Sequence, residues 1–155
     1  GRRAFVSGKK KQNTMKAAVI TDSRQRVLWV GNVRPGRMHD QTAIKSEGIL
    51  ACLAAFPGVQ VLVDAGYRGL AKLFPGQVIA PPLKCPKTAD EEERTKREEE
   101  RFAQSSARIV VEQAIGEMKH FRSLQRFIGR REQLPDTVAA IAGLVSDRNH
   151  DQEVA

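Results

Sequence analysis

Cysteine and long apolar runs are scarce in this chain, and their scarcity excludes several classes of protein. Two cysteines, Cys52 and Cys85, without a partner motif give neither a disulfide framework nor a zinc site. No segment approaches the roughly 20 apolar residues of a membrane-spanning helix, and Gly1–Val6 lacks the apolar core of a signal peptide. We therefore expect a cytoplasmic protein with reduced thiols and no membrane partner.

Acidic residues are absent from the first 16 positions, which carry six basic ones: Arg2, Arg3, Lys9, Lys10, Lys11 and Lys16. Outside Asp90–Arg101, 22 basic residues stand against 11 acidic ones. This balance indicates a polyanionic partner, with nucleic acid the leading candidate and a merely soluble basic surface the alternative. A length of 155 residues with 41% hydrophobic content is typical of one globular domain.

The apolar pattern predicts an α/β fold in which an antiparallel meander precedes a parallel strand. The expected strands are Phe5–Ser7, Met15–Ile20, Arg26–Val30, Val59–Val63 and Gln77–Ala80. A helix that Asp40 caps and Phe56 ends should carry the chain through a right-handed crossover to the fourth strand. Further helices are expected from a Thr88–Glu91 capping box, over Ser105–Ile128 and from Pro135, before a polar tail at Asp147–Ala155.

Two carboxylates occupy positions that suit a metal-dependent nuclease. Asp64 ends the apolar run Val61–Val63 and precedes a glycine turn, which is a common place for a catalytic acid. Glu112 lies on a predicted helix where Arg108 and Lys119 fall within about 40° of it, so that one acid stands between two cations. Taken singly, each acid has a simpler interpretation, a turn former for Asp64 and an ion pair for Glu112.

Four motifs in this order resemble the DDE transposases of the IS5 type, including the Harbinger-like endonucleases. Val6–Lys11 resembles the family's YSGKKK strand, and Pro35–Asp40 resembles its PGxxHD corner. Asp64–Gly69 is similar to DxGYxG, and Arg108–Lys119 matches the end of Y-x2-R-x3-E-x6-K. The resemblance covers roughly residues 5–145, and it implies a ribonuclease H-like fold, a mixed sheet flanked by helices, in the bacterial cytosol or nucleoid.

The resemblance also implies a chemistry and a partner. Three carboxylates, with Asp64 and Glu112 as two of them, would hold two Mg²⁺ or Mn²⁺ ions for phosphodiester cleavage and strand transfer. Phosphate oxygens would bind Arg108 and Lys119, and the DNA backbone of transposon ends would run along Lys9, Lys10 and Lys11. A further copy of the chain, in a homo-oligomer, is an additional candidate partner. His39, Asp40 and Tyr67 are expected near the site, although Asp40 also suits a helix cap and Tyr67 a packing residue.

Two departures from the family pattern bear on activity. Ser105 occupies the signature's tyrosine position. The family's first aspartate lies on a strand before the YSGKKK motif, and Asp22 is better explained as a turn residue than as its substitute. We therefore expect a fragment that lacks the first strand and does not cleave DNA as an isolated chain. The alternatives are an inactive DNA-binding remnant and a metal-dependent nuclease unrelated to transposition.

Overall fold

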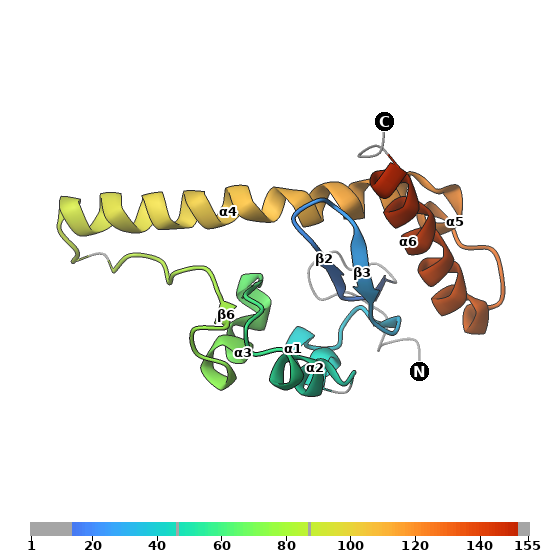
Figure 1. The fold of residues 1–155 in the computed structure, drawn as a ribbon, viewed down its shortest axis with the longest axis horizontal. Coiled ribbons are helices and arrows are strands. Elements are labelled where there is room, and N and C mark those ends of the chain that lie inside the picture. Colours follow the sequence, from blue (N-terminus) through green and yellow to red (C-terminus); the bar gives the residue numbers. More distant parts are fainter. Residues whose placement is uncertain (1–13, 46, 87, 152–155) are drawn as a thin grey trace. The chain divides into compact units, whose positions relative to one another are not determined.

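Two units make up the part of the chain that the computed structural model describes, which is residues 14–45, 47–86 and 88–151 (Figure 1). Unit 1 takes its described residues from the spans Gly1–His39 and Val110–Ala155, and unit 2 is formed by Asp40–Ile109. Both contain helices and short strands, so the architecture is mixed α/β as predicted. None of the described helices is long and apolar enough to span a bilayer.

The strands of unit 1 form two antiparallel pairs. They are β1 (Met15–Lys16), β2 (Val19–Thr21), β3 (Val27–Val30) and β4 (Arg34–Pro35). β2 pairs with β3, as the meander prediction requires, but β1 pairs with β4. The single strand predicted for Met15–Ile20 is therefore two strands, and the predicted strand Phe5–Ser7 lies outside the described residues.

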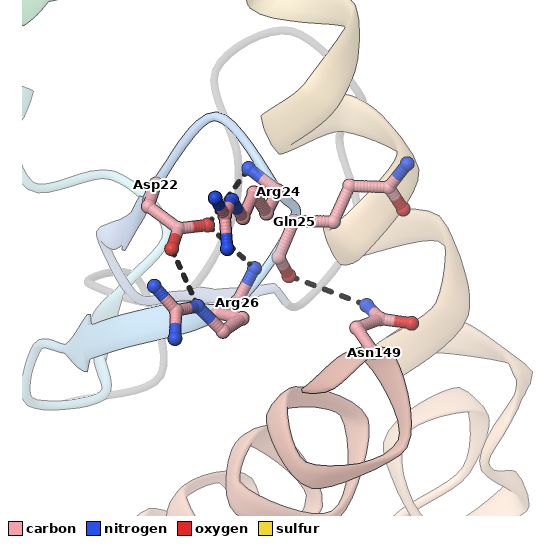
Figure 2. A network of polar contacts seen from close by, with 5 residues as sticks. All are labelled: Asp22, Arg24, Gln25, Arg26 and Asn149. Carbon is pink, nitrogen blue, oxygen red and sulfur yellow. Dashed lines mark hydrogen bonds and ion pairs between the residues drawn. The ribbon is translucent and has the colours of Figure 1, made fainter. Parts of the chain in front are cut away.

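The turn between β2 and β3 is organised by the carboxylate of Asp22 (Figure 2). Its Oδ1 accepts hydrogen bonds from the backbone N–H of Arg24 and Arg26, and its Oδ2 accepts one from Arg26 Nε at 2.6 Å. Burial acts to raise the pKa of Asp22, but these hydrogen bonds outweigh it and lower the pKa below its ordinary value. The structure thus agrees with the interpretation of Asp22 as a turn residue. The same turn accepts a hydrogen bond from Asn149 at the Gln25 carbonyl.

Helix α6 (Leu134–Asp151) closes the core of unit 1 by packing on β3. The buried cluster consists of Met118, Leu134, Val138, Ile141, Ala142 and Val145. The four residues predicted to face inward from this helix, Val138, Ile141, Ala142 and Val145, are all in it. The helix runs to Asp151, into the segment for which a polar tail is predicted, because Asn149 is buried and held by the β2–β3 turn.

Helix α4 extends without interruption from Glu91 to His120, with its residues up to Ile109 in unit 2 and the rest in unit 1. The prediction of two helices here is wrong, because no glycine or proline stands between Glu91 and Ile115 to end the first one. The predicted capping box at Thr88 is wrong as well. Asp90 caps the helix instead, since its Oδ1 accepts a hydrogen bond from the backbone N–H of Glu93 at 2.8 Å. The chain leaves the helical conformation at Phe121 and forms the short α5 (Arg122–Gln125) before η3 (Arg131–Gln133).

Unit 2 places a parallel strand pair among short helices. Its elements before α4 are α1 (Asp40–Lys45), α2 (Ile49–Ala55), β5 (Val61–Leu62), η2 (Ala65–Tyr67), α3 (Arg68–Leu73) and β6 (Val78–Ile79). The single helix predicted from Asp40 to Phe56 is interrupted at Gly48, whose φ of 75° is a left-handed conformation that glycine adopts without strain. β5 pairs with β6, whereas the prediction paired it with the meander.

Candidate functional site

Asp64 stands where the predicted strand ends and the glycine turn begins. β5 ends at Leu62, Val63 is buried, and Asp64 then caps the 3-10 helix η2 by accepting the backbone N–H of Ala65 on its Oδ1. The burial of Val63 holds the backbone at this point, while the Asp64 side chain is 60% exposed. A carboxylate held in this way is presented to solvent from a fixed position.

Arg108 on α4 is paired with this carboxylate. Its guanidinium nitrogen Nη1 lies 3.3 Å from Asp64 Oδ1, and the Arg108 side chain is only 22% exposed. Both contacts to Asp64 use Oδ1, so Oδ2 has no hydrogen-bond partner among the described residues. The structure therefore brings together the predicted catalytic acid and one of its predicted phosphate-binding residues.

A cavity of about 610 Å³ opens beside Asp64 and Arg108. Its polar lining is predominantly basic, because Arg68, Lys84 and Arg101 join Arg108, and Asp64 is its one acidic residue. Pro81, Pro82 and Leu83 give it an apolar wall, and Ala65, Gln104 and Ser105 complete the lining. The cavity therefore combines a concentration of positive charge with an uncharged wall.

Two buried polar atoms on residues of the cavity lining have no hydrogen-bond partner among the described residues. Gln104 is 8% exposed, and its Nε2 donates to the carbonyl of Ile79 while its Oε1 has no partner. Arg68 donates from Nη2 to the carbonyl of Pro81 at 2.8 Å, which ties the apolar wall to α3, and its buried Nε has no partner. Buried polar groups of this kind are few in native proteins, and a ligand or water usually satisfies them.

Tyr67 is the last residue of η2 and lies among carboxylates. Burial raises the pKa of its phenol, and the charges of Asp40, Asp64 and Glu47 raise that pKa further. Asp40 approaches this turn closely, because a Cβ added at Gly66 would lie 2.7 Å from Asp40 Oδ2. Asp40 and Tyr67 are therefore near Asp64, and α1 begins at Asp40.

The remaining predicted site residues belong to other parts of the chain. Glu112 and Lys119 are exposed residues of α4 in unit 1, and His39 is an exposed residue of the same unit. Lys9, Lys10 and Lys11 lie outside the described residues. Convergence of Glu112 with Asp64 stays a prediction.

Comparison with known proteins decides the family. The sequence model of the family described as DDE superfamily endonuclease matches residues 1–146. The chain belongs to the DDE superfamily endonucleases. It is 31% identical over 124 residues to a probable transposase for insertion sequence element IS702 from Microchaete diplosiphon. The match covers 77% of this chain and 41% of that relative, so the chain spans about two fifths of the relative's length. No solved structure matches it.

The donor chemistry of this member of the DDE superfamily suits a hard divalent cation, but the described residues do not assemble a complete metal site. Asp64 Oδ2 is a carboxylate oxygen of the kind that Mg²⁺ and Mn²⁺ prefer, and it lacks a hydrogen-bond partner among the described residues. No group of three histidine, cysteine, aspartate or glutamate side chains placed to hold a metal occurs in the described part of the chain. Asp64 therefore fits as one ligand of such an ion.

The titration of Tyr67 tests this arrangement of carboxylates around the turn. Because a nearby negative charge disfavours the phenolate, Asp64→Asn and Asp40→Asn should each lower the pKa of Tyr67 towards its ordinary value. The chain contains one tyrosine, so ultraviolet absorbance of the phenolate reports on Tyr67 alone. Glu92→Gln, a change at an exposed residue of α4, should leave the titration unchanged. A titration that neither aspartate variant moves would contradict the arrangement.

Several residues that line the cavity of this DDE superfamily member were not predicted from the sequence. Arg101 falls in the charged stretch Asp90–Arg101, where acidic neighbours surround it in the sequence, and it lines the cavity. Lys84 and Gln104 carry no motif that would single them out. Arg68 lies inside the DxGYxG-like segment, and this motif is the sequence feature that placed Arg68 near the site.

Proposed function

We propose that this chain is part of the catalytic domain of a DNA transposase, in which Asp64 and Glu112 are two of three carboxylates that bind two Mg²⁺ or Mn²⁺ ions. Such ions, when bound, activate the attacking oxygen and stabilise the leaving oxygen of a phosphodiester. The exposed carboxylate of Asp64, held at the end of β5 beside Arg108 in a chain of this family, is the observation that carries the proposal.

The basic residues around Asp64 support a phosphate substrate. Arg108 keeps its guanidinium beside the carboxylate, where a phosphate that binds next to Asp64 would also be within reach of this planar donor. Lys119 follows Arg108 on the same helix α4, and we propose that it holds a further phosphate of the DNA. The cations hold and orient the DNA backbone, and Asp64 keeps one oxygen open towards the metal.

We propose the ribonuclease H-like fold for the domain on the basis of its family and its element order. The antiparallel β2–β3 pair comes first, the helices α1 and α2 follow, and β5 then enters a parallel pair. The meander, the helices and the parallel strand follow one another in the order predicted from the sequence, although β5 pairs with β6 and not with the meander. Asp64, two residues after the end of β5, is where such a fold would present its second carboxylate.

Binding of Mn²⁺ to the whole chain tests the ligand assignment. Asp64→Asn and Glu112→Gln keep side-chain size and each removes a charged ligand, so each should weaken Mn²⁺ binding by about tenfold or more. The free Mn²⁺ that remains in solution is measured by electron paramagnetic resonance. Asp147→Asn and Glu99→Gln alter exposed acids elsewhere in the described chain and serve as matched controls.

Cleavage is the second measurement. In the protein encoded by the full reading frame that contains this chain, Asp64→Asn should reduce Mg²⁺-dependent nicking of DNA to background, while Asp147→Asn retains it. Mn²⁺ binding and nicking that both survive Asp64→Asn would refute the role of this carboxylate. Loss of activity in the control variants as well would show that the substitutions act on folding.

A further inference from the structure

We infer that the cavity beside Asp64 is a binding site for one unpaired nucleotide of the DNA strand, with its phosphate on the basic residues and its base against the apolar wall. This inference rests on the proposed function, because it names the part of the DNA substrate that this site takes. Its evidence is the cavity itself, since none of the metal-ligand predictions requires a cavity beside Asp64.

Size and charge fit a nucleotide. The volume of about 610 Å³ lies within the range of roughly 300–1,000 Å³ that is usual for small-molecule sites. Arg68, Lys84 and Arg101 lie in the lining together with Arg108, so a phosphate entering the cavity meets several cations from three separate segments of the chain. A duplex does not fit such a space, whereas a nucleotide turned out of the base stack does.

The apolar wall fits the base. Pro81, Pro82 and Leu83 form it, and Arg68 fixes its position by donating a hydrogen bond to the carbonyl of Pro81. A flat apolar surface can contact the face of any base, so it does not by itself select one of the four bases. A cavity built only for an inorganic anion would not need such a wall.

Gln104 joins the cavity lining to β6, because its Nε2 donates a hydrogen bond to the carbonyl of Ile79. Its Oε1 is covered by protein atoms and has no hydrogen-bond partner among the described residues, so it offers no exposed acceptor in the cavity. Contact with the apolar wall is therefore the interaction that a base gains here, and it does not distinguish adenine from the other bases.

Binding of small nucleotide probes to the whole chain, without metal, tests the site by isothermal titration calorimetry. We expect 2′-deoxyadenosine 5′-monophosphate to bind about tenfold more tightly than 2-deoxyribose 5-phosphate, which lacks the base. The corresponding 2′-deoxynebularine monophosphate lacks only the 6-amino group and should bind as tightly as the adenine compound, because the apolar wall contacts the face of the base. Equal affinity for all three probes would show that the cavity binds only the phosphate, and it would overturn the inference.

Two neighbouring serines provide a matched pair of variants. Ser105 lines the cavity and Ser106 does not, although both are exposed residues of α4. Ser105→Phe should fill the space and lower the affinity for deoxyadenosine monophosphate to that for deoxyribose phosphate, whereas Ser106→Phe should leave it unchanged. Equal effects of the two variants would overturn the placement of the base.

A failure of the nucleotide site can be distinguished from a failure of the proposed function. Nucleotide binding is measured without metal and does not depend on Asp64 and Glu112 being metal ligands. Loss of the base preference with normal Mn²⁺ binding would refute the nucleotide site alone. Normal nucleotide binding with Mn²⁺ binding unaffected by Asp64→Asn and Glu112→Gln would refute the metal assignment alone.

Discussion

Replacement of Ile141 by alanine should lower the free energy of unfolding by about 2–5 kcal/mol, which is a large part of the stability of a small domain. Ile141 is 5% exposed and belongs to the buried cluster between α6 and the strands of unit 1. Its removal costs the transfer energy of the lost methyl groups and leaves a cavity, because the neighbouring Val138 and Val145 are themselves fixed in the cluster.

Leu144 provides the control on the same helix. It is 58% exposed, so Leu144→Ala should change the free energy of unfolding by no more than about 0.5 kcal/mol. Urea unfolding followed by Trp29 fluorescence measures both variants, since Trp29 is the single tryptophan and lies on β3, against which α6 packs. Similar losses in the two variants would show that α6 does not bury the face containing Ile141.

The buried face of α6 could be predicted from the sequence because it depends on local periodicity. Val138, Ile141, Ala142 and Val145 repeat at the spacing of one helix face, and a proline near the start marks where the helix begins. The turn at Asp22 and the position of Asp64 after an apolar strand are equally local, since each is specified by fewer than ten adjacent residues.

Helix boundaries were harder to predict where the deciding residue gives an ambiguous signal. Gly48 interrupts the predicted helix between Asp40 and Phe56 through its positive φ, yet a glycine inside a helical pattern is often tolerated. The helix boundary predicted at Ser105 is absent from α4, because serine only weakens a helix and does not end it. The helix propensities of these residues differ by less than about 1 kcal/mol per residue, so tertiary packing decides where each helix ends.

The cavity could not be predicted because its residues come from three separated segments. Arg68 follows the Asp64 turn, Lys84 is in the proline-rich segment, and Arg101 is on α4. Charge pattern alone assigns Arg101 to a solvated face, since acidic neighbours surround it in the sequence. The parallel pairing of β5 with β6 places the proline-rich segment after Ile79 beside the Asp64 turn, and that pairing is a long-range feature.

Removal of the three lysines at 9–11 should give the largest change in DNA affinity. The chain has a net charge of +8, and its first 16 residues contain six basic and no acidic residues. Each lysine that contacts a phosphate contributes about 0.9 to the slope of log affinity against log salt, so Lys9→Ala, Lys10→Ala and Lys11→Ala together should reduce the slope by about 2.7. At about 0.1 M salt the same loss corresponds to nearly three orders of magnitude in affinity, about 2.7 log units.

Fluorescence anisotropy of a labelled duplex, measured across a range of salt concentrations, separates this local effect from net charge. The control triple variant Arg94→Ala, Lys96→Ala and Arg97→Ala also lowers the net charge from +8 to +5, but it acts on the acidic first half of α4. It should leave the salt slope nearly unchanged, because cations surrounded by carboxylates do not release counterions from DNA. Equal slopes for the two triple variants would mean that overall charge, and not a DNA contact at Lys9–Lys11, determines the affinity.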